Sequence, residues 1–228
     1  MIIDPTERFQ ALVDRPEPSV SLDEAMLLIA VHSTPTLDVP AQLSRLDELA
    51  GGCPNRSVEG LARYLFATGG FAGNLDDYYD PNNSFLDRVL DRRVGIPISL
   101  SVLAMEVGRR IGVPLVGIGM PGHFLVRSAT DTDVFVDPFG GGALLDRTGC
   151  VELYRAVMSS TRGFDDSMLE PVGTFAVLTR VLTNLEHIYA RRADTDAVAW
   201  VRRLLVAVPG SNRVTERSGA LRRVSRWN

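Results

Sequence analysis

Helical periodicity of the hydrophobic residues dominates the first 80 positions of the chain. Apolar side chains recur every three or four residues, and the runs end at proline or at paired glycines, which terminate helices. Ser21 to Glu24 match a capping box that opens the apolar run from Ala25 to Val31. The pattern predicts an all-helical N-terminal part, with helices over residues 6–15, 21–31, 40–50 and 57–69.

A change of period divides the middle of the chain. Gly95-Ile-Pro97 precedes a long, mostly apolar run to Ile111, and proline suits the first turn of a helix because its missing N–H costs nothing there. After Pro114 the apolar stretches become short, as in strands. We predict strands at 115–120, 124–127, 134–136 and 143–145, and helices at 84–92, 97–111, 151–158, 172–192 and 194–207. The fold class expected is α+β.

The connection over residues 71–84 combines turn formers and acids with three aromatic side chains. Phe71, Tyr78 and Tyr79 lead us to expect a loop that packs against the core. Its acids, Asp76, Asp77 and Asp80, lack the spacing of an EF-hand calcium loop, so we interpret them as a solvated acidic face.

The composition is that of an ordinary globular protein, with 45% hydrophobic and 23% charged residues among 228. The net charge of −4 argues against sequence-independent nucleic-acid binding, which needs a cationic surface. The first residues lack the pattern of a secretory signal, and no apolar run approaches the roughly 20 residues of a membrane span. We expect a cytoplasmic protein with neither a membrane nor a nucleic-acid partner.

Motifs for cofactors and metals are missing or out of context. The stretch Gly117 to Gly122 has the spacing of a dinucleotide fingerprint, but strand-like sequence follows where that fingerprint needs a helix. The three histidines lie far apart, and neither Cys-x-x-Cys nor His-Glu-x-x-His occurs. We therefore predict no cofactor and no metal site, and we expect Cys53 and Cys150 to be reduced thiols.

Three residues from separate predicted elements form a pattern typical of acyl transfer. The central helix begins near Ser99, His123 starts a strand, and Asp137 ends a neighbouring strand. Cysteine-type acyl transfer uses a nucleophile at a helix N-terminus, a histidine base and an orienting carboxylate. Each residue also has an ordinary alternative, because a histidine can bond a loop carbonyl, an aspartate can start a turn and a serine can be a small helix residue.

Five motifs in this region occur in a fixed order: Asn83-Ser-Phe-Leu-Asp-Arg-Val-Leu90, Arg93-Val-Gly-Ile-Pro-Ile-Ser-Leu-Ser101, Gly112-Val-Pro114, Pro121-Gly-His-Phe-Leu-Val-Arg127 and Val136-Asp-Pro-Phe-Gly-Gly141. Together they resemble the SirB1 family of the transglutaminase-like superfamily. The resemblance covers about residues 20–190 and is most specific over 82–146. It implies a papain-like core with a central helix on a small antiparallel sheet. The last predicted helices resemble one tetratricopeptide-type helix pair.

The resemblance also implies roles for individual positions. In catalytic members of the superfamily a cysteine opens the central helix, and that position corresponds to Pro97 here. His123 matches the superfamily histidine and Asp137 its acid. Ser99 lies two residues further on, about 200° around the helix axis, so it should point elsewhere. A serine hydroxyl is also far harder to ionise than a thiol. The nucleophile is therefore expected to be lost.

We divide the chain into an N-terminal helical part (1–80), a transglutaminase-like core (81–160) and C-terminal helices (161–228). The favoured interpretation is a non-catalytic module that binds a peptide or protein in a cleft around His123 and Asp137. The other residues predicted to line this cleft are Asn83, Ser84, Gly95, Ile96, Pro97, Ser99, Ser101 and Gly122.

Two alternatives stay open. An amide hydrolase or acyl transferase would use Ser99, Ser101 or a water with His123 and Asp137, and a serine oxygen should then lie within hydrogen-bond reach of the imidazole. A purely structural scaffold would have a filled cleft in which backbone groups satisfy His123.

Overall fold

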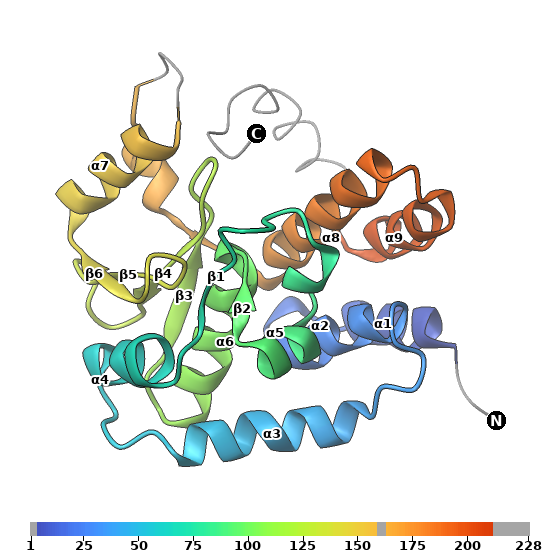
Figure 1. The fold of residues 1–228 in the computed structure, drawn as a ribbon, viewed down its shortest axis with the longest axis horizontal. Helices are drawn as coiled ribbons and strands as arrows, with labels where there is room; N and C mark the ends of the chain where they lie inside the picture. Colours follow the sequence, from blue (N-terminus) through green and yellow to red (C-terminus); the bar gives the residue numbers. More distant parts are fainter. Residues whose placement is uncertain (1–3, 159–162, 212–228) are drawn as a thin grey trace.

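A computed structural model of the chain describes residues 4–158 and 163–211. Parts of the predicted C-terminal segment and of the predicted loop over 159–171 lie outside these residues. The N-terminal part is helical, as predicted, and Figure 1 shows its helices below and beside the central helix. Its elements are α1 (Pro5–Val13), the short 3-10 turn η1 (Glu17–Ser19), α2 (Leu22–Val31), α3 (Val39–Gly51), α4 (Val58–Ala62) and a π-helical turn η2 (Arg63–Thr68).

Side-chain caps at the helix starts explain several of these boundaries. Asp38 and Ser57 accept backbone N–H groups of the first turns of α3 and α4. The capping box predicted at Ser21 is wrong in its bonding, although α2 does begin there. The Ser21 hydroxyl donates to Asp23 Oδ1 at 2.7 Å, and the same oxygen accepts the Glu24 N–H at 2.8 Å. The carboxylate of Asp23 is a stronger acceptor than a hydroxyl, so it takes the Glu24 N–H that Ser21 would accept in a capping box.

Helix α6 (Pro97–Arg110) is the centre of the fold, and eleven of its fourteen residues are buried. Proline occupies its first position, and two arginines in the last turn suit the negative end of the helix dipole. Just before it lie the 3-10 turn η3 (Pro81–Asn83), α5 (Leu86–Arg92) and a two-stranded parallel pair that was not predicted, β1 (Ala72–Gly73) with β2 (Val94–Gly95).

The main sheet has five antiparallel strands in the order β6-β5-β4-β3-β7. Its strands are β3 (Leu115–Ile118), β4 (Leu125–Ser128), β5 (Phe135–Asp137), β6 (Ala143–Leu145) and β7 (Pro171–Val172). Alternate side chains point to opposite faces. Val126 and Val136 join the core around α6, whereas Leu125 and Phe135 join a second cluster under α7 (Arg147–Val157). Both faces of the sheet are therefore covered.

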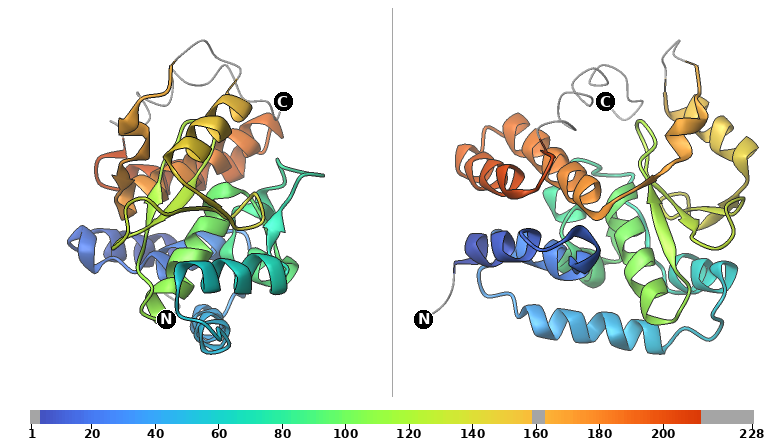
Figure 2. Two further views of the ribbon diagram at one scale, coloured as in Figure 1. Left: turned by 90° about the vertical axis from the view of Figure 1, so that its left-hand side faces the viewer. Right: turned by 180° about the vertical axis from the view of Figure 1, so that it is seen from behind.

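The C-terminal helices pack against the N-terminal helices. A 3-10 turn, η4 (Asp166–Leu169), leads to β7, and then α8 (Thr174–Arg191) and α9 (Thr195–Ala207) form a hairpin. This hairpin packs on α1 and α2, as the views in Figures 1 and 2 agree. One hydrophobic core runs from Phe9 to Val208 through all three predicted segments. The boundaries at 80 and 160 stay predictions.

The α+β class is confirmed as a mixture of helices with a small antiparallel sheet. Strand β7 was missed, since two residues ending in Val172 carry no periodic signal and only tertiary pairing with β3 makes them a strand. None of the described helices is long and apolar enough to cross a membrane.

Candidate functional site

His123 and Asp137 lie together at one end of the sheet. His123 stands two residues before β4, and Asp137 is the last residue of β5. Because β4 and β5 are antiparallel neighbours, the beginning of one strand lies beside the end of the other. The His123 Nε2 atom is 2.8 Å from Asp137 Oδ1, and the two residues are only 4% and 5% exposed.

The carboxylate of Asp137 determines which ring nitrogen of His123 carries the proton. An ionised carboxylate only accepts hydrogen bonds, so the Nε2–H of His123 donates to Asp137 and a neutral ring keeps a lone pair on Nδ1. Asp137 Oδ1 also accepts the N–H of Phe139 at 3.1 Å, which holds the carboxylate in place. The buried Nδ1 atom has no hydrogen-bond partner among the described residues. The pair is therefore an oriented base with an unused acceptor.

The hydroxyl of Ser99 is used in structural hydrogen bonds. It is fully buried, and its hydroxyl lies 2.6 Å from the carbonyl oxygen of Asn83, to which it donates. The Ile96 N–H donates to the same hydroxyl oxygen at 3.1 Å. The hydroxyl thus caps the start of α6 and ties it to the turn η3. Nothing in the described chain bonds a serine to His123, so the expectation of Ser99 as nucleophile is not met by this geometry.

Hydrogen bonds from Asn83 fix the loop over 71–84, and Gly95 leaves room for the Ser99 hydroxyl beside it. The Asn83 side chain accepts from Asn74 Nδ2 at 3.0 Å and donates to the Asp77 carbonyl at 2.7 Å, and the residue is fully buried. A Cβ atom on Gly95 would lie 2.7 Å from Ser99 Oγ, so only glycine leaves room for that hydroxyl. The predicted packing of this loop is confirmed. Ser84 is also buried, and its hydroxyl has no partner among the described residues.

The remaining predicted cleft residues serve packing and the backbone. Ser101 is buried and donates to the Phe124 carbonyl at 3.4 Å, which places the second turn of α6 against the residue that follows His123. Ile96 and Pro97 are buried at the helix start. Gly122 has a φ of 73°, and a Cβ there would lie 2.9 Å from the Met158 sulfur. Gly122 therefore faces the segment after α7 and does not line the space around His123.

Neither cysteine forms a hydrogen bond with His123 among the described residues. Both thiols are free and buried. Burial raises the pKa of Cys150 to about 11, and the negative charges of Asp146 and Asp137 contribute to this rise. The Cys53 thiol bonds the Asn55 carbonyl in the N-terminal part. The structure therefore offers no thiolate beside His123 within the described residues.

Three side chains around His123 were not predicted. The Phe139 ring meets the imidazole edge-on with centroids 6.0 Å apart, and Tyr78 meets Phe139 in the same way. Arg180 of α8 donates to the carbonyls of Met120 and His123 at 3.0 and 2.7 Å, and its guanidinium lies 5.5 Å from the Phe124 ring centroid.

The side chain of Arg180 is partly buried, and it forms no ion pair with an Asp or Glu side chain of the described chain. Burial lowers its pKa from the ordinary value, and Tyr78 opposes the shift. Two carbonyls and an aromatic face compensate the guanidinium in place of a carboxylate. Arg180 was missed because it lies 57 residues from His123 in a helix whose periodicity indicates only packing.

Comparison with known proteins identifies the family of the chain. A family model described as the transglutaminase-like superfamily matches residues 31–183. The chain belongs to the transglutaminase-like superfamily. No solved structure matches it. Among the described residues, no group of three or more His, Cys, Asp or Glu side chains is arranged to hold a metal ion.

The relatives of this superfamily member include UPF0162 proteins and an F-box protein. A UPF0162 protein of Xylella fastidiosa strain Temecula1 is 40% identical in an alignment of 181 positions that covers 72% of this chain and 64% of that protein. A UPF0162 protein of Pseudomonas aeruginosa is 31% identical over 183 residues, covering 76% of this chain and 67% of the relative. Human F-box only protein 21 is 38% identical in an alignment of 89 positions that covers 35% of this chain and 14% of that protein. The chain thus spans just under two thirds of the first relative.

Proposed function

We propose that this transglutaminase-like domain binds a peptide, or a small acyl or amide group, at the His123–Asp137 pair without cleaving it. The observation that carries the proposal is the buried, oriented imidazole of His123, whose Nδ1 atom has no hydrogen-bond partner among the described residues. The family resemblance supports it, since it aligns Pro97 with the cysteine of catalytic members. We also infer membership of the SirB1 family, a cytoplasmic location, and a tetratricopeptide-like role in protein contact for α8 and α9.

An amide is the ligand whose chemistry suits this site. The first N–H groups of a helix have no partner within the helix, and they favour a carbonyl oxygen or an anion. The Nδ1 lone pair of His123 favours an N–H donor. One amide supplies both groups. Because the imidazole is only 4% exposed, a single amide edge fits the space better than a bulky side chain.

NMR of the His123 imidazole nitrogens tests this proposal. A panel of N-acetylated tripeptide amides is titrated into uniformly ¹⁵N-labelled protein, with His123→Ala identifying the ring signals. An N–H bond to Nδ1 should shift that nitrogen saturably while the peptides stay intact over days. Absence of a saturable shift with every peptide would overturn the binding function.

A second candidate is an amide hydrolase in which His123 activates a water. The same unused Nδ1 favours it, since a carboxylate-oriented imidazole is a general base. Incubation of the same peptides with protein at pH 6–9 separates the two. Turnover that is lost in both His123→Ala and Asp137→Asn would establish the hydrolase, and intact peptides would exclude it.

A further inference from the structure

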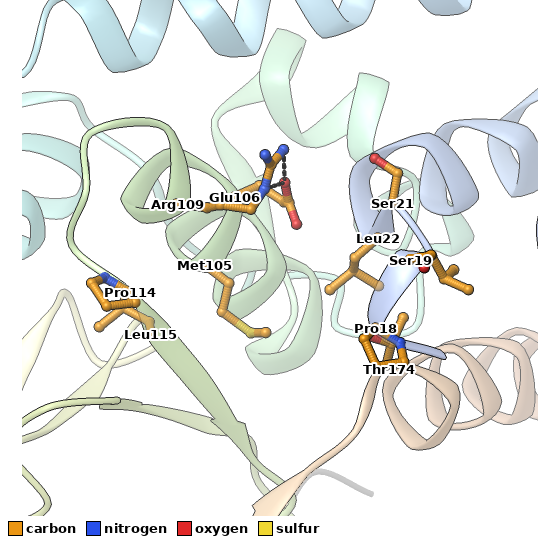
Figure 3. A pocket seen from close by; sticks show the side chains of 11 residues that line it. Pro18, Ser19, Ser21, Leu22, Met105, Glu106, Arg109, Pro114, Leu115 and Thr174 are labelled. Carbon is orange, nitrogen blue, oxygen red and sulfur yellow. Dashed lines mark hydrogen bonds and ion pairs between the residues drawn. The ribbon is translucent and has the colours of Figure 1, made fainter. Parts of the chain in front are cut away.

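A pocket of about 470 Å³ lies beside the second half of α6, away from the His123 site. Four separate parts of the chain meet around it: the link from η1 to α2, helix α6, the start of β3 and the start of α8. Figure 3 shows the side chains of these parts converging on one space. Glu106 lies nine residues along the helix from Pro97, about 13 Å at 1.5 Å per residue, so this is a separate place in the fold.

Six of the eleven residues that line the pocket are apolar, and the other five are polar or charged. Pro18, Leu22, Met105 and Leu115 surround the space, and the hydroxyl residues Ser19 and Thr174 stand on the side of η1 and α8 (Figure 3). A lining of this mixed kind suits a small organic ligand that has both an apolar and a polar part.

Glu106 supplies a buried acceptor in this lining. Its residue is 5% exposed, and its Oε2 atom accepts from Arg109 Nε at 2.9 Å and Arg110 Nη1 at 3.1 Å. The second carboxylate oxygen points toward the space between Met105 and Leu22 in Figure 3. An oxygen of a buried carboxylate is poorly solvated, so a ligand that donates to it gains more than it would at the surface.

The charges around Glu106 favour a cation as that donor. Among the described residues, Asp23, Asp47 and Glu106 pair with two guanidiniums, those of Arg109 and Arg110. The cluster therefore carries one negative charge in excess when all three carboxyls are ionised. Asp23 is buried close to Glu106 and is 1% exposed. Burial raises the pKa of Glu106, and the charge of Asp23 raises it further, whereas Arg109 opposes the shift.

We propose that this pocket binds a small organic cation, in which a primary ammonium donates to Glu106 and an attached apolar group packs on Met105, Leu22 and Leu115. The ammonium completes the charge balance of the ion cluster, and the apolar group fills the space that Figure 3 shows in front of it.

Calorimetric titration with 2-phenylethylamine tests the proposal, with 2-phenylethanol as the uncharged analogue. The amine should bind at least tenfold more tightly than the alcohol. Its affinity should rise with pH as Glu106 loses its proton. Glu106→Gln should remove both the preference for the amine and the pH dependence, while Glu186→Gln, the same change in an ion pair between α8 and α9, should leave them intact.

Ser19→Trp is the independent variant, because it fills the pocket and leaves the ion cluster in place. It should weaken amine binding at least tenfold without altering the unfolding temperature by more than a few degrees. The proposal is overturned if the amine does not bind saturably, if the alcohol binds equally well, or if Ser19→Trp binds the amine like the wild type.

Discussion

The hydroxyl of Ser99 and the carbonyl oxygen of Asn83 are 2.6 Å apart, and this hydrogen bond joins the first turn of α6 to the turn η3. Since the side chain of Asn83 in turn holds the backbone of Asp77 and Tyr78, the aromatic loop and the central helix form one bonded unit. The same serine was a candidate nucleophile. The hydrogen bonds of Ser99 account for a serine at this position without a catalytic role.

Ser99→Ala should therefore lower stability rather than remove a reactive group. The change leaves the Ile96 N–H and the Asn83 carbonyl without their buried partner, which costs about 1–3 kcal/mol for such a group. Urea unfolding measures the loss. Ser101→Ala, whose hydroxyl makes only one long bond at 3.4 Å, is the matched control and should cost less. Equal losses in the two variants would contradict this role.

Pro97→Cys should restore a reactive thiol. The position opens α6, where the helix dipole lowers the pKa of a thiol, and His123 has an unused acceptor to take the proton. We expect alkylation by iodoacetamide at pH 7 to be at least tenfold faster at the introduced thiol than at Cys150, because burial raises the pKa of the Cys150 thiol to about 11.

The double variant Pro97→Cys, His123→Ala is the control for this rate. If His123 accepts the proton, the pH at which alkylation becomes fast should move upward in the double variant. An unchanged pH profile would show that the imidazole does not reach the helix start, and it would weaken the proposed binding site as well.

Arg180→Met should loosen the turn that carries His123. Methionine keeps a long apolar side chain, but the carbonyls of Met120 and His123 lose their donors. We expect a loss of about 1–3 kcal/mol in urea unfolding and a shift of the His123 ring nitrogens in NMR spectra. Arg180→Lys should recover part of both effects. Arg202→Met, on the exposed face of α9, should change neither.

The motifs predicted the meeting of His123 and Asp137, because each stands at a strand end and two antiparallel neighbours must bring those ends together. They did not predict the bonds of Ser99. Those depend on where the turn at Asn83 lies after folding, sixteen residues away. Gly122 was placed in the cleft because it adjoins His123, yet its left-handed backbone turns it toward Met158. Neighbours in sequence need not share a face.

Arg180 and Glu106 show a second limit of sequence reasoning. Each lies in an amphipathic or largely apolar helix, where periodicity reports burial but not the partner. The carbonyls that accept from Arg180 belong to a turn 57 and 60 residues away, and Arg110, which binds Glu106, also binds Asp23, 87 residues away. Such contacts follow from tertiary packing and leave no local pattern.

Asp87→Asn should stabilise the protein, and more so at high pH. Asp87 is 3% exposed in α5, and its Oδ1 atom has no partner among the described residues. Burial raises the pKa of Asp87 above its ordinary value, although the adjacent backbone N–H and Arg88 oppose the shift. A carboxyl whose folded pKa is raised favours the folded state fully below its unfolded pKa, and this contribution is lost as the pH rises through the folded pKa. Asparagine does not ionise, so the variant avoids this loss.

Urea unfolding at pH 4.5, 6 and 8 measures the effect. The free energy of unfolding of Asp87→Asn minus that of the wild type should grow from the lowest pH to the highest. Asp91→Asn, four residues along the same helix and paired with Arg45 at the surface, should show no such growth, since its side chain is 48% exposed. A difference for Asp87→Asn that stays constant with pH would mean that the buried carboxyl does not titrate in this range.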